Sequence, residues 1–519
     1  MSDGLFDAVL FDRDGTLIAD RPYSGDPAGV TPMPGARAAL DRLRANGLRV
    51  GVVTNQSAVG RGRLTRDQVD QVNRRVDELL GPFDTWQVCP HTPEDGCDCR
   101  KPRAGLVHAA ADTLGVPARR CVVVGDIASD VDAALAAGAT PLLVPNQQTR
   151  VAEVIAAPSA VTDLETAADW ILLRHRIVQP TAPLPRPGNN VLVVRPDSLG
   201  DVVVTGPAVR AIAANAGKVT VWCGPRGSAA ARLLPGVDDV VEYATPWIDA
   251  DPAPVSPAGL AEFAEDLARR DFDEALIFTS YHQSPLPTAL VLRLAGVRRI
   301  TAISHDYPGS LLDLRVRPPD DLPEPVRALA VAAAAGYRLP ADDPGDLLVD
   351  LGQPVMRTSQ IVVHPGGSAA ARTCPPELMA QVVAALRAAG LPVLVTGGPG
   401  ERELTAQVAV AGAVDVGGRT DVAGLTRLLA AAACVVTANT GPAHLAAATG
   451  TPVVSLFAPT VPFERWGPYR TPVVRLGDPA AACRDTRATE CPLPGHPCLS
   501  SITPADVVAA VDRLVRRVA

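Results

Sequence analysis

Short runs of valine, leucine and isoleucine recur along the chain, and each ends in a turn of glycine and polar residues. The runs on which the pattern rests span residues 8–10, 50–53, 122–124, 191–194, 361–363 and 434–436. Continuous apolar runs of this length are typical of parallel strands that are buried on both faces. Helix-like segments alternate with them, so we predict an α/β protein whose ligands bind at the carboxyl ends of the strands.

The length of 519 residues exceeds one ordinary domain and suits three of typical size. Residues 163–175 predict a helix, and residues 179–188, which contain four prolines, predict a stiff extended linker. We therefore expect a first domain, a helix with a linker, and two further αβ units, over residues 1–150, 151–188, 189–350 and 351–519.

Composition and charge narrow the classes of function. The formal net charge of −8 argues against general nucleic-acid binding. No apolar run approaches the roughly eighteen residues of a membrane span, and the start Met1 to Gly4 lacks a basic, apolar signal segment. Ten cysteines, most of them apart or in metal-like spacing, agree with a reducing compartment. We expect a cytoplasmic protein without a transmembrane segment.

Two carboxylates stand on one turn after the first apolar run. Asp12 and Asp14 both project above the sheet there, where one can attack phosphorus while the other handles the proton, and Gly15 allows the sharp turn. A calcium loop would need a further Asp or Asn two residues on and a glutamate at its end, which this segment lacks. The turn therefore indicates phosphate chemistry.

Three later segments add the groups that such chemistry needs. The hydroxyls and amides at the end of the second run can hold phosphoryl oxygens; they belong to Thr54, Asn55, Gln56 and Ser57. Lys101 is one of only two lysines in the chain. Asp126 ends a further strand and suits a magnesium ligand beside Asp12, whereas Asp130 is either a second ligand or an ordinary acid in the first turn of a helix.

In this order the four segments resemble the haloacid dehalogenase superfamily of phosphatases, over about the first 150 residues. The resemblance implies a Rossmann-like domain in which Asp12 is the nucleophile and forms an aspartyl-phosphate. Asp14 would protonate the leaving oxygen and then activate water. Mg²⁺ would be held by Asp12, Asp126 and the backbone carbonyl of Asp14, and Arg100 and Lys101 would contact the substrate.

Cys89, His91, Cys97 and Cys99 lie within eleven residues, enough for a closed tetrahedral zinc site, although reduced cysteines in a loop remain the alternative. Their spacing resembles the branch of the superfamily that contains heptose 1,7-bisphosphate phosphatase and histidinol-phosphatase. The zinc would be structural and would stiffen the loop that carries Arg100. The segment from Thr54 to Gly62 resembles the heptose enzymes, whereas the five-residue spacer after His91 also fits histidinol-phosphatases.

The second half of the chain has its own glycine-rich turns after apolar runs. Ser198 to Asp201 follow one run, His364 to Ser368 follow another with Arg372 just beyond, and Asn439 to His444 follow a third. Such turns can give backbone N–H groups to phosphate, and Thr440 or Gly441 can cap a helix that faces a diphosphate. Each turn by itself is weak evidence for a phosphate site. The evidence comes from the order of the turns along the chain.

From about residue 189 onward the chain resembles glycosyltransferase family 9, the heptosyltransferases, whose two Rossmann-like domains face each other in the GT-B arrangement. The resemblance implies that Asp201 is the general base of an inverting transfer; a helix N-cap is the plainer alternative. It also implies a donor site made of Ser368, Arg372, Thr440, Gly441 and His444. Asn439 departs from the family, many of whose members carry an acidic residue near that point, and Arg195 faces either the cleft or the surface.

A second cysteine cluster lies near the end of the chain, at Cys483, Cys491, His496 and Cys498. Its irregular spacing favours packing of a proline-rich tail over metal binding. We therefore predict a bifunctional enzyme, a sugar-phosphate phosphatase fused to a transferase that uses a nucleotide-activated heptose and an unidentified acceptor. Two alternatives stay open: a histidinol-phosphatase-like or other phosphomonoesterase fused to a transferase of another sugar, or one half that serves as a silent binding or docking module.

Overall fold

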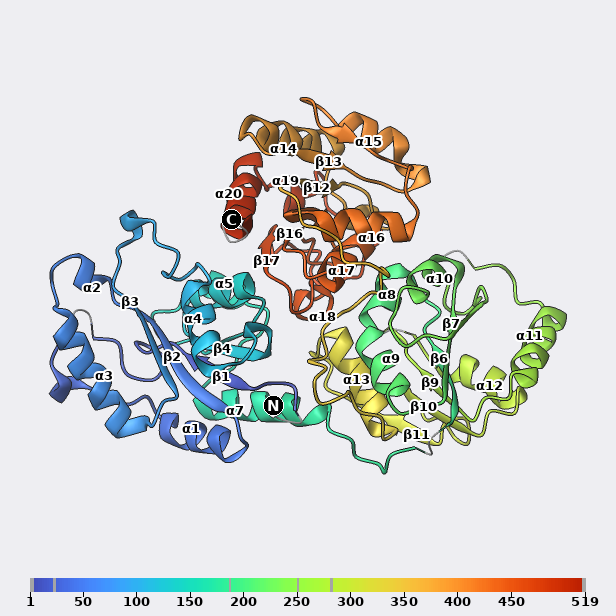
Figure 1. The fold of residues 1–519 in the computed structure, drawn as a ribbon, viewed down its shortest axis with the longest axis horizontal. Helices are drawn as coiled ribbons and strands as arrows, with labels where there is room; N and C mark the ends of the chain where they lie inside the picture. The colour runs from blue at the N-terminus through green and yellow to red at the C-terminus, as the bar shows by residue number, and fades with distance from the viewer. Residues whose placement is uncertain (1–3, 22–24, 186–187, 250–251, 281–282, 516–519) are drawn as a thin grey trace.

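The computed structural model describes residues 4–21, 25–185, 188–249, 252–280 and 283–515. Three parallel sheets follow one another along the chain, each flanked by helices (Figure 1). The predicted α/β class with parallel sheets is confirmed. Residues 1–3, on which the expected lack of a signal segment depends, and 186–187 of the proline-rich segment lie outside the described residues. No helix in the described part of the chain is long and apolar enough to span a bilayer.

The first sheet has the order β3-β2-β1-β4-β5. Its strands are β1 (Ala8–Phe11), β2 (Arg49–Asn55), β3 (Thr85–Cys89), β4 (Cys121–Gly125) and β5 (Thr140–Leu143). Its helices are α1 (Ala36–Ala45), α2 (Ser57–Gly60), α3 (Arg66–Leu80), α4 (Gly105–Leu114), α5 (Ala128–Ala137), α6 (Val151–Ala156) and α7 (Leu164–Ile177). Because β1 pairs in parallel with both β2 and β4, the carboxyl ends of these three strands meet at one edge.

Helix α7, the helix predicted over residues 163–175, packs onto the first unit. Asp163 caps its N-terminus by accepting a hydrogen bond from the backbone of Thr166. Ala167 and Ile171 of α7 share a hydrophobic core with Leu40 of α1. The first unit therefore continues to the end of α7, beyond the residue 150 expected from the sequence.

The second sheet has the order β11-β10-β9-β6-β7-β8 and the third β14-β13-β12-β15-β16-β17. The second unit contains β6 (Asn190–Val194), α8 (Leu199–Val204), α9 (Gly206–Ala213), β7 (Lys218–Cys223), α10 (Pro225–Ala231), β8 (Asp239–Glu242), α11 (Pro257–Arg269), β9 (Glu274–Ile277), α12 (Leu286–Leu294), β10 (Arg299–Ile303), β11 (Leu314–Val316) and α13 (Glu324–Ala334).

The third unit contains β12 (Ile361–His364), α14 (Pro376–Ala388), β13 (Val393–Val395), α15 (Arg402–Val408), β14 (Val414–Asp415), α16 (Val422–Ala431), β15 (Cys434–Ala438), α17 (Gly441–Ala448), β16 (Val453–Leu456), α18 (Phe463–Trp466), β17 (Val473–Leu476), α19 (Pro497–Ser500) and α20 (Pro504–Val515). Single-turn 3₁₀ helices lie at Pro27–Gly29, Pro93–Asp95, Ala118–Arg120, Ala370–Arg372 and Pro399–Glu401.

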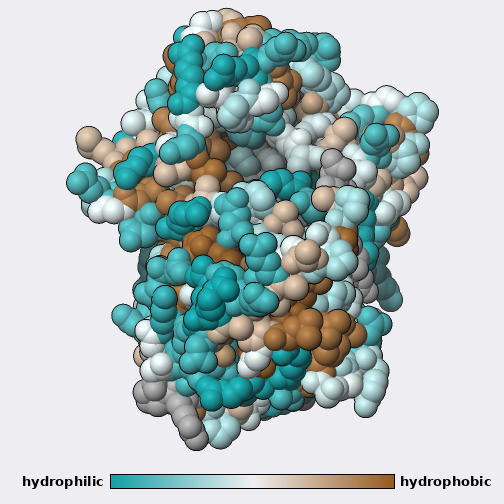
Figure 2. Space-filling view, turned by 90° about the vertical axis from the view of Figure 1, so that its right-hand side faces the viewer, coloured by the Kyte–Doolittle hydropathy of each residue, from teal (hydrophilic) through white to brown (hydrophobic). Residues whose placement is uncertain are grey.

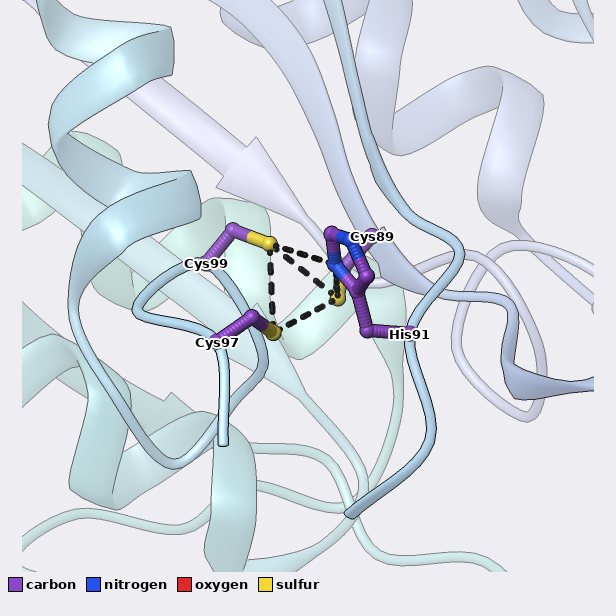
Figure 3. A group of neighbouring side chains, drawn as sticks. All are labelled: Cys89, His91, Cys97 and Cys99. Atoms are coloured by element: carbon purple, nitrogen blue, oxygen red, sulfur yellow. Dashed lines mark hydrogen bonds between the residues drawn. The ribbon is translucent and has the colours of Figure 1, made fainter. Parts of the chain in front are cut away.

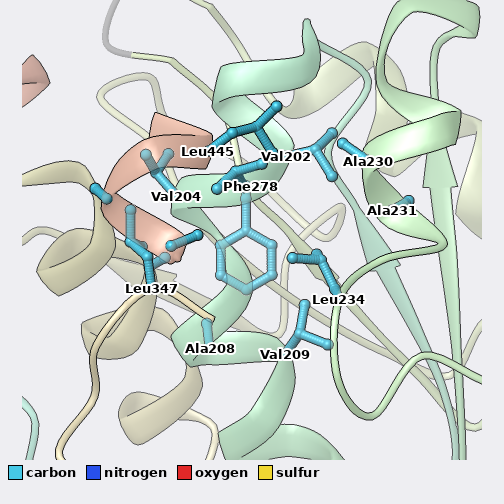
Figure 4. Close-up of a cluster of buried hydrophobic side chains, with 14 of the residues drawn as sticks. Val202, Val204, Ala208, Val209, Ala230, Ala231, Leu234, Phe278, Leu347 and Leu445 are labelled. Carbon is cyan, nitrogen blue, oxygen red and sulfur yellow. The ribbon is translucent and has the colours of Figure 1, made fainter. Parts of the chain in front are cut away.

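The second and third units share a hydrophobic core where α8 meets α17. Leu445 of α17 lies beside Val202 and Val204 of α8, near Phe278 (Figure 4). Glycines allow this approach: a Cβ atom added at Gly441 would lie 2.7 Å from the side chain of Leu199. The two helix N-termini are thereby brought face to face.

The first unit contacts both of the others. Leu322 and Val326 of the second unit belong to the hydrophobic core of the first, and Tyr469 of the third packs against it. Arg470 donates hydrogen bonds to the carbonyl oxygens of Leu5, at 2.7 Å, and Pro344, at 2.5 Å. One side chain of the third unit therefore bonds to the first and to the segment that joins the second and third.

The face of the molecule that carries α11 and α12 is mixed, with hydrophilic residues surrounding a few apolar patches (Figure 2). Leu290 and Leu294 of α12 are among the exposed apolar side chains. Scattered exposed apolar residues of this kind are common on protein surfaces.

Candidate functional sites

The first site lies where β1, β2 and β4 end. Asp12 directly follows β1 and is tied to the end of β4, because its N–H donates to the carbonyl of Val124. The Lys101 ammonium lies 2.5 Å from Asp12 Oδ1 and 2.6 Å from Asp130 Oδ1, and it donates to the carbonyl of Val53 at 2.9 Å. The lysine charge is therefore placed beside the predicted nucleophile.

The loop that brings Lys101 to this place is held by Asn55. The Asn55 side chain accepts a hydrogen bond from the Lys101 N–H and donates one to the Lys101 carbonyl, both at 3.1 Å. Such a paired contact fixes the lysine backbone at the end of β2. Arg100, the other predicted substrate contact from this loop, donates to the backbone carbonyl of His91 at 3.2 Å.

Several acidic groups surround this one lysine, and the balance of charge is unfavourable without a further cation. Burial raises the pKa of Asp12 to about 8, against the opposing effect of Lys101. Burial, and then the Asp130 carboxylate, raise the pKa of Asp126 to about 6. A divalent cation beside these two oxygen ligands would offset the repulsion, so the residues fit Mg²⁺.

The Asp126 carboxylate is held in place from both sides. Thr16 donates to Oδ1 at 3.2 Å and Asn146 donates to Oδ2 at 2.8 Å. Gly15 has a φ of +83°, and a Cβ atom there would lie 2.4 Å from Asp126 Oδ2. A glycine is therefore required at this turn both by its conformation and by the close approach of the carboxylate.

Asp14 lies at the open edge of the site, with 28% of its side chain exposed. It accepts a hydrogen bond from Gln56 Nε2 at 2.7 Å, and the same amide nitrogen lies 3.0 Å from Thr54 Oγ1. Arg13 Nη2 donates to it at 2.9 Å. The remaining residue of the predicted phosphoryl-binding turn, Ser57, begins α2.

The predicted cysteine and histidine ligands come together at the end of β3 (Figure 3). The Sγ atoms of Cys89, Cys97 and Cys99 lie 3.3 to 3.7 Å apart, and His91 Nδ1 lies 3.2 Å from Cys99 Sγ. Ligands about 2.3 Å from a tetrahedral zinc ion lie roughly 3.8 Å from one another, so the arrangement fits a closed site. Among the described residues, only this group gathers three or more cysteine, histidine or acidic side chains within 4.8 Å.

The second site lies where β6 ends. Arg195 is buried, and its Nη2 donates to Asp201 Oδ1 at 2.9 Å while its Nε lies 3.0 Å from Asp197 Oδ2. The surface position left open for Arg195 is therefore wrong. Burial alone would raise the pKa of Asp201, but the Arg195 charge and the hydroxyl of Ser198 outweigh it and lower that pKa.

Ser198, and not Asp201, is the N-cap of α8. Asp201 occupies the third helical position, where its Oδ2 accepts from the Ser198 hydroxyl at 2.6 Å and from the Ser198 N–H at 3.3 Å. This is a capping box. The N-cap alternative for Asp201 is wrong, although the residue does help to begin the helix.

The predicted donor-binding residues approach Asp201 from the third unit. Thr440 precedes α17 and Gly441 begins it, and a Cβ atom added at Gly200 would lie 2.9 Å from His444 Cδ2. The Asp201 carboxylate acts on the pKa values of both His444 and Arg372. Ser368 is exposed on the turn after β12.

On the third-unit side of this site, two buried side-chain nitrogens have no hydrogen-bond partner among the described residues. They are His444 Nδ1 and Asn439 Nδ2, on side chains that are 4% and 7% exposed. Burial lowers the pKa of His444 to about 4, against the opposing effect of Asp201. Buried polar groups are normally paired, so these atoms point to a ligand that completes the site.

The chain is similar to two groups of known proteins. A family model described as haloacid dehalogenase-like hydrolase matches residues 25–138. The probable D-glycero-D-manno-heptose-1,7-bisphosphate 7-phosphatase of Thermoplasma volcanium is 38% identical over 122 residues, which cover 23% of this chain and 84% of that protein. The corresponding phosphatase of Pseudomonas putida is 36% identical over 141 residues, covering 26% and 81%. The chain belongs to the haloacid dehalogenase-like hydrolases.

Part of the remaining chain is similar to a second family. A model described as glycosyltransferase family 9 (heptosyltransferase) matches residues 314–496. The crystal structure of a glycosyl transferase family 9 protein from Veillonella parvula superposes with a TM-score of 0.54 at 17% identity, covering 65% of this chain and all of that one, which shows a shared fold. The two matches together support a bifunctional enzyme with a phosphatase unit and a glycosyltransferase domain.

Sequence reasoning missed residues that act through the predicted ones. Asn146 holds Asp126, Asp197 pairs with Arg195, and Arg13 bonds to Asp14. Each is a polar residue in a turn that directly follows a strand, which is the signal by which the others were found. Some of their partners, however, lie in turns that are distant in sequence. Others are adjacent in sequence, and the sequence does not show in which direction their side chains point.

Proposed function

We propose that the phosphatase unit is a magnesium-dependent phosphatase that removes the C7 phosphate of D-glycero-D-manno-heptose 1,7-bisphosphate. The observation that carries this proposal is the convergence of Asp12, Lys101 and Asp126 at the strand ends. The substrate is supported by the names of the similar phosphatases, of whose length this chain covers about four fifths.

In the proposed reaction Asp12 attacks phosphorus and forms an aspartyl-phosphate while the bond from phosphorus to the sugar oxygen breaks. Asp14 gives its proton to that oxygen and later takes one from the water that hydrolyses the intermediate. Lys101 offsets the negative charge of the phosphate next to Asp12. Bound Mg²⁺, with Asp12, Asp126 and the Asp14 carbonyl as ligands, supplies further positive charge to the phosphoryl oxygens.

The cysteine and histidine group is proposed to hold a structural zinc ion. Its ligands come from β3 and from the loop that ends in Lys101. A closed four-ligand site leaves no position for substrate, so the ion would act on the shape of this loop. Through it, Arg100 and Lys101 would be held over the phosphate.

The transferase units are proposed to move a heptose from a nucleoside diphosphate to an acceptor hydroxyl with inversion. Asp201 would take the proton of that hydroxyl. The start of α17, His444 and Arg372 would hold the leaving diphosphate, since helix N-termini and cations favour anions. The unpaired His444 Nδ1 and Asn439 Nδ2 support a ligand at this place.

The two reactions would not be consecutive. Removal of the C7 phosphate leaves a sugar 1-phosphate, which a nucleotidyl transfer must convert into a nucleotide sugar before a transferase can use it. The fusion of the two units would then mean that both reactions belong to one pathway.

Phosphate release from heptose 1,7-bisphosphate and from histidinol phosphate tests the first activity. We expect a higher kcat/KM for the heptose substrate, and a preference for histidinol phosphate would favour the alternative phosphatase. For the second activity, calorimetry with a panel of nucleoside diphosphates should show binding that Arg372→Ala weakens by roughly 1.5–3 kcal/mol. Absence of any nucleotide binding by the folded protein would favour the docking-module alternative.

A further inference from the structure

Arg13 lies between Asp12 and Asp14 in the sequence and is almost fully buried, with 4% of its surface exposed. Its Nε lies 3.1 Å and its Nη2 2.9 Å from Asp14 Oδ2, and Nη2 also lies 3.1 Å from Asp14 Oδ1. One edge of the guanidinium therefore holds the carboxylate by a forked contact. This contact fixes direction as well as charge.

The other edge of Arg13 is fixed by helix α3. Arg13 Nη1 donates to Asn73 Oδ1 at 2.7 Å, and Asn73 is itself 8% exposed. The guanidinium cannot turn without breaking one of these contacts. Together with Gln56, which donates to Asp14 Oδ2, the contacts fix Asp14 from three segments of the phosphatase unit.

Asp14 lies near two other carboxylates. The carboxylates of Asp12 and Asp20 both interact with it, and burial and then Asp14 raise the pKa of Asp20. Without Arg13, repulsion would favour positions of Asp14 away from the nucleophile. With Arg13, Asp14 stays beside Asp12 while 28% of its side chain remains open.

We propose that Arg13, fixed by Asn73, is a positioning residue that holds Asp14 where it protonates the leaving oxygen, so that the enzyme can cleave sugar phosphates, whose leaving groups are poor. The proposal rests on the proposed function, in which Asp14 is the acid. In the step concerned the bond from Asp12 to phosphorus forms, the bond from phosphorus to the sugar oxygen breaks, and the Asp14 proton goes to that oxygen. A nitrophenolate leaves without such a proton, so its release does not need the contact.

The test compares two substrates in the full-length enzyme with Mg²⁺. Single-turnover rates are measured for sugar release from heptose 1,7-bisphosphate and for p-nitrophenolate release from p-nitrophenyl phosphate. For Arg13→Gln we expect the sugar rate to fall about 100-fold, with KM changed less than about threefold and nitrophenolate release lowered less than about threefold. Arg13→Lys, which keeps the charge but not the fork, should lie between Arg13→Gln and wild type.

Two further variants keep the test decisive. Asn73→Ala removes the contact at the outer edge of Arg13. It should lower sugar release more than nitrophenolate release, but to a smaller degree than Arg13→Gln. This variant tests the proposal even if Arg13→Gln does not fold. Arg44→Gln removes a guanidinium that bonds to the carbonyls of Leu80 and Pro82 and to Asp41 and lies over the Phe83 ring, away from Asp14. It should lower the melting temperature without changing the ratio of the two rates.

The outcomes separate the proposal from the function on which it rests. Asp14→Asn should show the strongest selective loss of sugar release; if it does not, the role of Asp14 in the proposed function is wrong. If Asp14→Asn is selective but Arg13→Gln and Asn73→Ala lower both rates equally, Arg13 is only a structural ion pair and the present proposal is overturned.

Discussion

The ammonium of Lys101 lies 2.5 Å from Asp12 Oδ1 and lies between that carboxylate and Asp130. Asp130 also accepts a hydrogen bond from the Ile127 N–H at the start of α5. The sequence left open whether Asp130 binds magnesium or serves as an acid in the first turn of a helix. In the structure it is an acid of that turn and the second partner of the lysine.

Replacement of the nucleophile should separate the two activities. Asp12→Asn keeps the shape of the side chain but removes the attacking charge, so we expect phosphate release to fall at least about 1,000-fold. Nucleotide binding by the transferase units should not change. Asp67→Asn, on the exposed start of α3, serves as the control. Near wild-type phosphate release by Asp12→Asn with Mg²⁺ would contradict the mechanism.

Metal analysis tests the cysteine site. Protein purified without chelators should hold about one zinc ion per chain, and Cys97→Ser combined with Cys99→Ser should abolish it because two ligands cannot close a tetrahedral site. The melting temperature should fall with the loss of metal. Cys491→Ser, the same change in the second cysteine cluster, should leave the zinc content unaltered. A wild-type protein without zinc would show the site to be a group of reduced thiols.

Binding of a diphosphate should take up a proton on His444. The pKa of His444 is about 4 in the protein without ligand, and a bound anion favours the charged imidazole and raises that pKa. Affinity should therefore increase as pH falls from about 7.5 to 5.5, more than titration of the ligand explains. Calorimetry in buffers of different ionisation enthalpy measures the uptake.

His444→Gln should remove that part of the proton uptake, whereas His108→Gln, in the phosphatase unit, should not. Equal uptake by wild type and His444→Gln would mean that His444 does not face the diphosphate.

The junction of the three units predicts association of separated parts. Residues 1–178 and 188–519 each contain complete sheets, so both fragments should fold, and the apolar contact through Leu322 and Val326 should bring them together in solution. Arg470→Ala removes the hydrogen bond to the Leu5 carbonyl, which crosses between the two fragments, and should weaken this association about tenfold or more. Size-exclusion chromatography and calorimetry measure it, with Arg402→Ala as the control.

Two fragments that fold but do not associate would show that the units are joined only by the chain. Failure of the first fragment to fold would show that its core needs the residues of α13.

The strands, and the order along the chain of the turns that carry functional residues, were predictable. Each buried strand is a continuous apolar run that ends in a distinctive turn. Asp12 and Asp126 were found in this way, whereas Lys101 was marked by the rarity of lysine, and Cys89, His91, Cys97 and Cys99 by their close spacing. A strand end is a local signal, and parallel pairing then brings neighbouring ends together. The two families followed from the same turns.

Only the tertiary structure decided which side chains pair. Arg195 was undecided in the sequence because the direction of a side chain at a strand end depends on what packs above it, and here Asp197 and Asp201 do. Arg13 stands in such a turn as well, but its pairing could not be predicted because its partner Asn73 is sixty residues away.

The packing of the units against one another could not be predicted from the sequence either. The proline-rich segment predicted a separating linker, but the core of the phosphatase unit includes Val326 of α13 and Leu322, which lies just before this helix. An apolar helix face predicts that the helix packs against another part of the protein. It does not show which unit provides that packing surface, because the contacts are made by residues distant in sequence. The sequence by itself determined the two chemistries, and the tertiary structure decided that Arg470 joins the units which perform them.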